Sequence, residues 1–319
     1  MPDTFFLKIS QGFGNKLCNV LIGLFFKYIN NATFYTLILN SEHDKDGDNS
    51  IIEIFPEIKD YMIIFNNWNE VDQKFNKIKS KDIWCKSYFD INNFKFASNS
   101  KTIHFIRGGV GCYKHIFDIY NNLPLEYKNL IRINEKLISN KIINITNKDY
   151  IAVHIRYGDK LKISLNILNP FNNKLKNQYT YIIYTPEFYI KIIKYFLKKK
   201  LKIYILTDDV KIVEYFIMRK INNKNVILLD LPFLESFYIL SKSKFNILST
   251  STFSFLATLI NKKLKKAYIV QRPLDIKNYS IPDEFMLKDE NKKIKKLKNK
   301  KYILNYNIDL MKQMININN

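Results

Sequence analysis

Basic residues stand at the end of one short apolar run in the second half of the chain. His154, Arg156, Gly158 and Asp159 close the run of residues 149–155 as a His-x-Arg-x-Gly-Asp motif. A strand buried on both faces is almost entirely apolar, so two basic side chains at its end need a partner. Arginine can hold a diphosphate through two hydrogen bonds and offset its charge as it leaves. The motif therefore indicates a binding site for an anionic group.

Acidic and hydroxyl side chains follow three further apolar runs. They are Thr207, Asp208 and Asp209 after residues 202–206, Asp230 and Glu235 after residues 225–229, and Ser249, Thr250, Ser251, Thr252 and Ser254 after residues 245–248. A hydroxyl-rich turn that opens a helix presents backbone N–H groups and the positive end of the helix dipole to a phosphate. Carboxylates nearby can accept hydrogen bonds from a purine base or a ribose. Since no Walker A sequence is present, the combination indicates a nucleotide diphosphate site without a P-loop.

Each of these residues also has a structural interpretation. Ser251 and Thr252 could cap a helix, and Asp208 and Asp209 could mark a helix start. His154 could be a hydrogen-bonded residue of the core. The functional interpretation rests on the convergence of the four groups.

Apolar runs and amphipathic segments alternate through the second half of the chain. The predicted strands are residues 149–155, 202–206, 225–229, 245–248 and 267–270, and the predicted helices are residues 185–200, 209–219, 233–241 and 252–262. Strict alternation with short connections predicts a parallel, doubly wound sheet. Ligands of such sheets bind where strands end and helices begin. The four polar groups should therefore share one edge of the sheet.

The first half begins with the same alternation. A strand at residues 4–9, a glycine-bearing turn, a helix at residues 16–29 and a strand at residues 33–39 are predicted. The turn carries Gly12, Gly14 and Asn15, which would let the backbone approach a substrate. A polar loop follows at residues 41–50, the pattern is then irregular, and helical periodicity returns at residues 126–143. Two α/β halves would place a cleft between them, with the polar residues 160–180 as a loop over it.

These elements define three parts of the chain. Residues 1–159 form an N-terminal α/β domain on the acceptor side, which ends in the His-x-Arg-x-Gly-Asp motif, and residues 160–285 form a C-terminal Rossmann-like domain. Residues 286–319 are interpreted as a basic helical tail that could pack back on the first domain, and the basic run at 292–301 as solvated. The expected fold is α/β and GT-B-like, with two Rossmann-like domains facing a central cleft.

Composition narrows the class of protein. Hydrophobic residues make up 47% of the chain, which is ample for a packed core, and the net charge is +22. Lysines are spread among asparagines and isoleucines rather than clustered with arginines, so we expect no specific nucleic-acid partner, although a basic nucleic-acid-binding protein stays an alternative. A basic protein also attracts a small anionic substrate.

Cysteine usage and the N-terminus bear on the compartment. Cys18, Cys85 and Cys112 are an odd number without Cys-x-x-Cys spacing, which favours reduced thiols over a disulfide framework or a zinc site. We see no signal peptide, and the apolar residues 17–29 are interrupted by Asn19 and Lys27. A cytoplasmic, membrane-free protein is expected, in the host cytoplasm if the source is a virus.

Four segments resemble motifs of the α-1,2-fucosyltransferase family (glycosyltransferase family 11). Residues 11–17 resemble its Gly-Gly-Leu-Gly-Asn-Gln-Leu segment, residues 153–159 its His-x-Arg-Arg-Gly-Asp motif, residues 207–209 its Ser-Asp-Asp, and residues 247–255 its Asn-Ser-Thr-Phe-Ser-Trp-Trp segment. Order and spacing agree from residue 5 to about residue 262.

The resemblance implies a galactoside α-1,2-fucosyltransferase-like activity. GDP-fucose would be the donor and a glycan the acceptor, with inversion at the anomeric carbon and no metal or other cofactor. Arg156 would bind the diphosphate with support from His154. Ser251, Thr252, Phe253 and Ser254 would surround the phosphates and guanine, while Asp230 or Glu235 would accept the guanine N–H groups.

The chain departs from the family pattern at three places. Tyr157 stands for the second arginine, Thr250 for the asparagine, and Phe255-Leu256 for the tryptophan pair. A transferase of another nucleotide sugar and a non-catalytic glycan-binding relative therefore remain alternatives. Asp159 is a candidate catalytic base, with a structural partner of Arg156 as the other interpretation.

Overall fold

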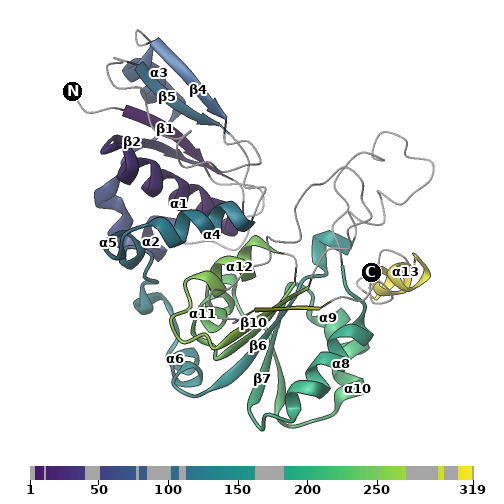
Figure 1. Cartoon of the computed structure of the whole chain (residues 1–319). Coiled ribbons are helices and arrows are strands. Elements are labelled where there is room, and N and C mark those ends of the chain that lie inside the picture. Colours follow the sequence, from purple (N-terminus) through teal and green to yellow (C-terminus); the bar gives the residue numbers. More distant parts are fainter. Residues whose placement is uncertain are drawn as a thin grey trace. The chain divides into compact units, whose positions relative to one another are not determined.

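The computed structural model describes residues 4–10, 12–39, 51–76, 79–84, 102–107, 113–161, 183–249, 251–270, 294–297 and 308–317. The chain divides into two compact units, Met1–Leu137 and Ile138–Asn319. Each unit is built on a parallel β-sheet (Figure 1). The predicted α/β class with two Rossmann-like units is confirmed.

The first unit contains a five-stranded sheet in the order β3-β2-β1-β5-β4, and all of its strand pairs are parallel. Its strands are β1 (Thr4–Ile9), β2 (Thr33–Ile38), β3 (Ile63–Phe65), β4 (Lys79–Trp84) and β5 (Thr102–Arg107). Its helices are α1 (Phe13–Asn30), α2 (Ile51–Ile54), η1 (Pro56–Tyr61), α3 (Trp68–Phe75), α4 (Tyr113–Asn122), α5 (Leu125–Asn129) and η3 (Glu135–Leu137). The predictions for β1 and β2 are confirmed, and α1 is present but begins at Phe13, so that Gly14 and Asn15 of the predicted turn lie in its first turn. Strands β3, β4 and β5 lie where the sequence showed no regular pattern.

The side chains of β1 alternate between two faces of this sheet. Phe5 points toward α1 and contacts Phe26 and Phe34, with ring centroids 5.8 and 4.8 Å away. Phe6 points to the opposite face, where it packs with Leu37 and the α3 residues Val71 and Phe75 in a separate core cluster. The sheet is therefore covered by helices on both faces, as a parallel sheet requires.

The second unit contains a six-stranded parallel sheet in the order β11-β10-β9-β6-β7-β8. Its strands are β6 (Tyr150–Ile155), β7 (Lys202–Thr207), β8 (Val226–Leu229), β9 (Phe245–Leu248), β10 (Lys266–Val270) and β11 (Ile294–Leu297). Counted from β6, the order is 3-2-1-4-5-6 when read from the β8 edge, which is the order of the Rossmann fold. Strands are added on one side of β6 up to β8 and on its other side from β9 onward. The junction of β6 and β9 is therefore the topological switch point.

Helices cover both faces of this second sheet, with α11 and α12 on one face and α8, α9 and α10 on the other (Figure 1). They are α6 (Asn140–Thr146), α8 (Pro186–Leu197), α9 (Val210–Val213), a π-helical turn (Glu214–Met218), α10 (Arg219–Ile221), α11 (Phe233–Lys242), α12 (Thr252–Leu259) and α13 (Ile308–Asn316). Thr185 caps α8 by accepting the N–H of Phe188, and Pro186 occupies its first turn, as predicted.

The boundary between the units lies earlier than the sequence analysis placed it. The division falls between Leu137 and Ile138, whereas the predicted N-terminal domain extended to residue 159. The physical reason is that β6 pairs with β7 and β9 and so belongs to the second sheet. A strand pattern shows that a segment is extended and buried, but it does not show which strands pair with it.

The C-terminal segment also differs from the predicted helical tail. Residues Ile294–Leu297, inside the basic run, form β11 and extend the second sheet beside β10. Met311 and Met314 of α13 are fully buried in the core of the second unit, together with residues of α8 such as Ile193. The expectation that the tail packs on the first domain is therefore corrected. The helix itself is present.

Some predicted features fall outside the described residues. They are the polar loop at 41–50, Gln11, Thr250, Cys85, Cys112 and residues 162–180 of the predicted loop. Cys18 is buried, and burial raises the pKa of its thiol. Among the described helices, none is long and apolar enough to cross a membrane.

Gly23 of α1 provides a test of the packing in the first unit. A Cβ atom at this position would collide with the ring of Phe34, which is 1% exposed. We therefore expect Gly23→Ala to lower the free energy of unfolding by about 1–3 kcal/mol through overpacking. Chemical denaturation measures the loss, and the double variant G23A/F34L should regain part of it. Equal stability of G23A and the wild type would contradict this packing.

Candidate functional site

The switch point of the second sheet carries a direct link between two strand ends. His154 is the fifth residue of β6, and its Nδ1 lies 2.7 Å from the Oγ of Ser249, the residue after β9. Both side chains are buried, with 4% and 7% of their surface exposed. The crevice beyond the carboxyl ends of strands at such a switch point is where doubly wound proteins bind ligands. The predicted convergence of β6 and β9 residues is present.

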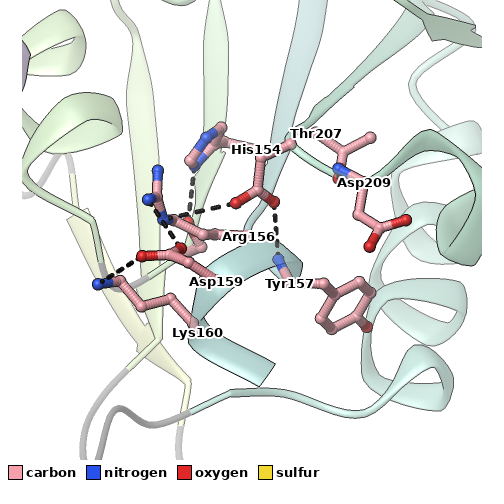
Figure 2. A network of polar contacts seen from close by, with 9 residues as sticks. His154, Arg156, Tyr157, Asp159, Lys160, Thr207 and Asp209 are labelled. Carbon is pink, nitrogen blue, oxygen red and sulfur yellow. Dashed lines mark hydrogen bonds and ion pairs between the residues drawn. The ribbon is translucent and has the colours of Figure 1, made fainter. Parts of the chain in front are cut away.

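Arg156 follows β6 and is held by two carboxylates. Its Nη2 donates to Oδ1 of Asp159 at 3.0 Å, and its Nε faces Oδ2 of Asp208 at 3.6 Å. Lys160 forms an ion pair with the other oxygen of Asp159 at 3.3 Å. Figure 2 shows the Asp159 carboxylate between Arg156 and Lys160. The Arg156 Nε is buried and forms no hydrogen bond in the part of the chain that is described, so the guanidinium has donor capacity to spare.

Asp208 connects the end of β7 to the turn after β6. Its Oδ1 accepts the backbone N–H of Tyr157 at 2.9 Å, while Oδ2 faces Arg156. A Cβ atom at Gly158 would lie 2.5 Å from Oδ2 of Asp208, a distance that real side chains essentially never adopt. The glycine of the motif is therefore required so that the carboxylate can reach both the arginine and the turn.

Tyr157 occupies the position where the resembled family has a second arginine. Its ring points away from Arg156 (Figure 2), is fully buried in the core of the second unit, and contacts Tyr189. Its hydroxyl donates to the backbone oxygen of Tyr184 at 3.0 Å. At this position the chain therefore has a core residue whose ring points away from Arg156.

Burial and charge set the protonation of the three titratable groups. Burial, together with the positive charge of Arg156, lowers the pKa of His154 to about 3, so the imidazole is neutral near pH 7. Burial alone would raise the pKa of Asp159, but the charges and hydrogen bonds of Arg156 and Lys160 outweigh it and lower the pKa. Burial raises the pKa of Asp208 above its usual value, although Arg156 and the Tyr157 N–H oppose the shift.

The first turn of α12 lies next to His154. Ser251 is the N-cap residue, and no side chain caps the helix or places an acidic group in its first turn. The ring of Phe253 is half-buried and lies 5.4 Å from that of His154 and 5.3 Å from that of Phe237. Ser254 is fully buried and donates to the backbone oxygens of Ser249 and Ser251, so it braces this turn from within.

Several predicted site residues have structural partners. Asp209 caps α9 by accepting the N–H of Ile212 at 3.1 Å, and Thr207 Oγ1 accepts the N–H of Asp209. Glu235 accepts the N–H of Ser139, the residue before α6, at 3.1 Å. Asp230 is exposed after β8. The helix-start interpretation therefore holds for Asp209. Of the two carboxylates proposed for guanine, Glu235 already accepts a backbone N–H, whereas Asp230 is exposed to solvent.

The glycine-bearing turn belongs to the first unit. Gly12 precedes α1, and its carbonyl accepts the N–H groups of Asn15 and Lys16 at 2.9 and 3.1 Å. Apart from its own chain neighbours, no described residue has an atom within 4 Å of where a Cβ of Gly12 would be. Gly14 is buried in the first turn of α1, while Asn15 is half-buried. The open space at Gly12 is compatible with the predicted close approach of a ligand.

Sequence reasoning missed one charged residue of the site. Lys160 was not predicted, although a lysine directly after the His-x-Arg-x-Gly-Asp motif was a visible signal. Asp208 was predicted to bind the donor; in the structure its carboxylate contacts Arg156 and the N–H of Tyr157. Among the described residues, no group of three or more His, Cys, Asp or Glu side chains could hold a metal ion.

No known protein-family profile matches this chain, and no curated protein sequence is similar to it. Among solved structures, the chain is similar to POFUT1 in complex with GDP, at 11% identity and a TM-score of 0.49, over 84% of this chain and 98% of that one. It is also similar to the fucosyltransferase NodZ from Bradyrhizobium, at 11% identity and a TM-score of 0.46, over 84% and 95%. For NodZ alpha-1,6-fucosyltransferase co-crystallised with GDP the TM-score is 0.47, at 11% identity over 86% and 97%.

The neutral state of His154 predicts a pH dependence of stability. The pKa of His154 is about 3 in the folded protein and 6.5 for an ordinary histidine. As the pH falls below about 6.5, the unfolded chain therefore binds a proton that the folded chain does not, and the free energy of unfolding decreases. From pH 7 to pH 5 this group should remove about 2 kcal/mol of stability.

Chemical denaturation of the wild type and of His154→Asn at both pH values measures this contribution. Asparagine keeps a polar atom for Ser249 but has no proton to gain, so the loss should be smaller in the variant by about that amount. An identical pH dependence in the two proteins would show that His154 is not held neutral.

Gly158→Ala tests the contact between Asp208 and the turn after β6. Because the added Cβ would displace the Asp208 carboxylate, we expect a loss of about 1–3 kcal/mol in the free energy of unfolding. Gly12→Ala, where space is open, is the matched control and should lose less. Thermal or chemical denaturation of both variants measures the two losses. Equal losses in the two variants would contradict the close approach of the Asp208 carboxylate to Gly158.

Proposed function

We propose that this chain transfers L-fucose from GDP-fucose to a sugar hydroxyl, with inversion at the anomeric carbon. The observation that carries the proposal is the convergence of Arg156, His154 and the first turn of α12 at the switch point of a Rossmann-order sheet. The four motifs that resemble those of α-1,2-fucosyltransferases supply the choice of donor. The finer proposal is an α-1,2 linkage to galactose or a similar residue.

The diphosphate would lie between Arg156 and the first turn of α12. Arginine offers paired donors, and the N-terminus of a helix without acidic residues offers backbone N–H groups and a positive dipole end. In the structure one end of the guanidinium donates a hydrogen bond to Asp159. A diphosphate would exchange with this carboxylate or bind beside it, since Lys160 is a second cation at the same place.

The nucleobase would be recognised by the groups beside the diphosphate. The half-buried ring of Phe253 offers a surface on which a purine can stack. His154 is neutral, so it can serve as a hydrogen-bond donor or acceptor without adding charge. The exposed carboxylate of Asp230 is the better candidate of the two proposed acceptors for guanine N–H groups, because Glu235 is engaged at Ser139.

The proposed reaction is a direct displacement at the anomeric carbon of GDP-fucose. The acceptor hydroxyl attacks the anomeric carbon of fucose from the side opposite the GDP. A new C–O bond forms, the C–O bond to the β-phosphate breaks, and the hydroxyl proton passes to a base. Negative charge would grow on the diphosphate as the bond breaks, and Arg156 would stabilise it. With its pKa lowered, Asp159 is a weak base, so its proposed role is to orient Arg156.

A transfer assay tests the proposed function. GDP-fucose is incubated with lactose, N-acetyllactosamine and other oligosaccharides, and mass spectrometry detects a product heavier by one deoxyhexose. NMR of the product then gives the linkage. We expect Arg156→Ala to lower kcat at least about 100-fold, because a preorganised donor to the developing charge is lost.

Two variants sharpen the assay. Arg156→Lys keeps the charge without the paired donors and should recover part of the rate, while Tyr157→Phe removes only a core hydroxyl and should leave kcat nearly unchanged. Transfer from UDP- or ADP-sugars in place of GDP-fucose would overturn the choice of donor. Binding of GDP-fucose without transfer to any acceptor would favour a non-catalytic glycan-binding protein.

A further inference from the structure

An exposed tryptophan stands at the carboxyl-end edge of the first sheet. Trp68 begins α3, three residues after the end of β3, and 45% of its side chain is exposed. The strand ends at this edge are aligned, because Lys8 of β1 is in register with Leu37 of β2, which is in register with Phe65 of β3. Trp68 therefore lies at the edge where β1 passes into the glycine-bearing turn.

The indole is supported from the sheet side. Phe6 of β1 lies beneath it, with ring centroids 5.9 Å apart, and Phe6 is in turn packed against Leu37, Val71 and Phe75. The backbone before Trp68 is fixed by a capping box, since Asn67 accepts the N–H of Glu70 at 3.0 Å and Glu70 accepts the N–H of Asn66 at 3.0 Å. One side of the indole is therefore supported by Phe6, while 45% of the residue remains exposed.

A cation lies beside the same ring. The Nζ of Lys8, an exposed residue on the face of β1 that also carries Phe6, is 5.9 Å from the centre of the indole. Such a contact is weak at an exposed position, so the ammonium keeps hydrogen-bond donors for another partner. An aromatic face and a donor side by side complement a sugar ring, which has apolar C–H groups on one face and hydroxyls around its rim.

We propose that Trp68 and Lys8 form a sugar-binding platform that holds a pyranose ring of the acceptor glycan. The indole would stack on the C–H face of the ring, and the Lys8 ammonium would donate to one of its hydroxyls. The proposal deepens the function proposed above and rests on it for the identity of the ligand as an acceptor. Its position follows from the fold, because polar ligands of doubly wound sheets bind beyond the carboxyl ends of the strands.

The chain contains two tryptophans, Trp68 and Trp84, which allows a direct binding test. In Trp84→Phe, Trp68 is the sole indole and reports on its own surroundings by fluorescence. Titration of this variant with galactose-, glucose-, N-acetylglucosamine- and mannose-terminated oligosaccharides should give a saturable change with at least one of them. The absence of a change with the whole series would overturn the proposal.

Steady-state kinetics of a Trp68 variant test whether the residue binds the acceptor and not the donor. We expect Trp68→Ala to raise the KM for the acceptor about tenfold while the KM for GDP-fucose and the melting temperature with GDP stay unchanged, as for an aromatic contact made equally in substrate and transition state. Trp68→Phe should retain part of the affinity and Lys8→Met should lose part of it. Tyr195→Ala, which removes a 59% exposed aromatic from α8 of the second unit, is the matched control and should leave both KM values unchanged.

Two outcomes separate this proposal from the proposed function. A saturable fluorescence change without any fucosyl transfer would support the sugar platform and contradict the enzymatic activity. Transfer with an unchanged acceptor KM in Trp68→Ala would support the activity and overturn the platform. A smaller sedimentation mass of Trp68→Ala than of the wild type would show that a second copy of the chain covers the indole, which also overturns it.

Discussion

The structure of the site depends on how the partly buried guanidinium of Arg156 is balanced. Arg156 leaves the end of β6 with its Nε buried while 30% of its side chain is exposed, and a cation that loses part of its hydration is stabilised by anions beside it. Asp208 supplies one such charge from β7 and Asp159 supplies another from the turn. Because Asp208 also takes the N–H of Tyr157, the arginine, the turn and the neighbouring strand are fixed as one unit. Gly158 is the residue that makes room for this arrangement.

The same balance bears on the proposed binding of a diphosphate. Arg156 and Lys160 carry two positive charges, while Asp159 and Asp208 carry at most two negative ones. Asp159 is partly exposed, whereas Asp208 is more deeply placed and has its pKa raised by burial. In the proposed function, a diphosphate would compete with the outer carboxylate of Asp159 while Asp208 keeps the arginine in place. On the other side of β6, the contact between His154 and Ser249 ties the start of α12 to the same strand end.

Much of the second unit could be predicted from its sequence. The strands from Tyr150–Ile155 to Lys266–Val270 are short apolar runs bounded by polar turns, and such runs are informative without any knowledge of their partners. Which strands pair with one another cannot be inferred from such local runs. The contact of His154 with Ser249 spans 95 residues and that of Tyr157 with Asp208 spans 51, so only the rule for parallel sheets could anticipate the edge, and nothing local could assign Asp208 its role as a support.

The failures have equally local causes. Strand Ile63–Phe65 is too short to show a period, while Lys79–Trp84 has two lysines, a serine and an aspartate among its six residues. The units divide before α6 and not at residue 159, because the His-x-Arg-x-Gly-Asp motif follows a strand that pairs within the second sheet. Strand Ile294–Leu297 was not predicted, because it lies in a run of lysines and such a run is typical of a solvated segment. The buried methionines of α13 show that this end of the chain contributes to the core.

The central claim is that Arg156, at the switch point of the second sheet, binds the diphosphate of a guanine nucleotide. The most direct test is the melting temperature of the wild type and of Arg156→Ala in the presence of GDP, UDP and ADP. A ligand that binds only the folded state, at about 100 times its dissociation constant, should stabilise the protein by about 2.7 kcal/mol. The account predicts that GDP raises the melting temperature of the wild type, that UDP and ADP do so much less, and that Arg156→Ala loses the response. An equal response of both proteins to GDP, or no response of the wild type to any nucleotide, would contradict it.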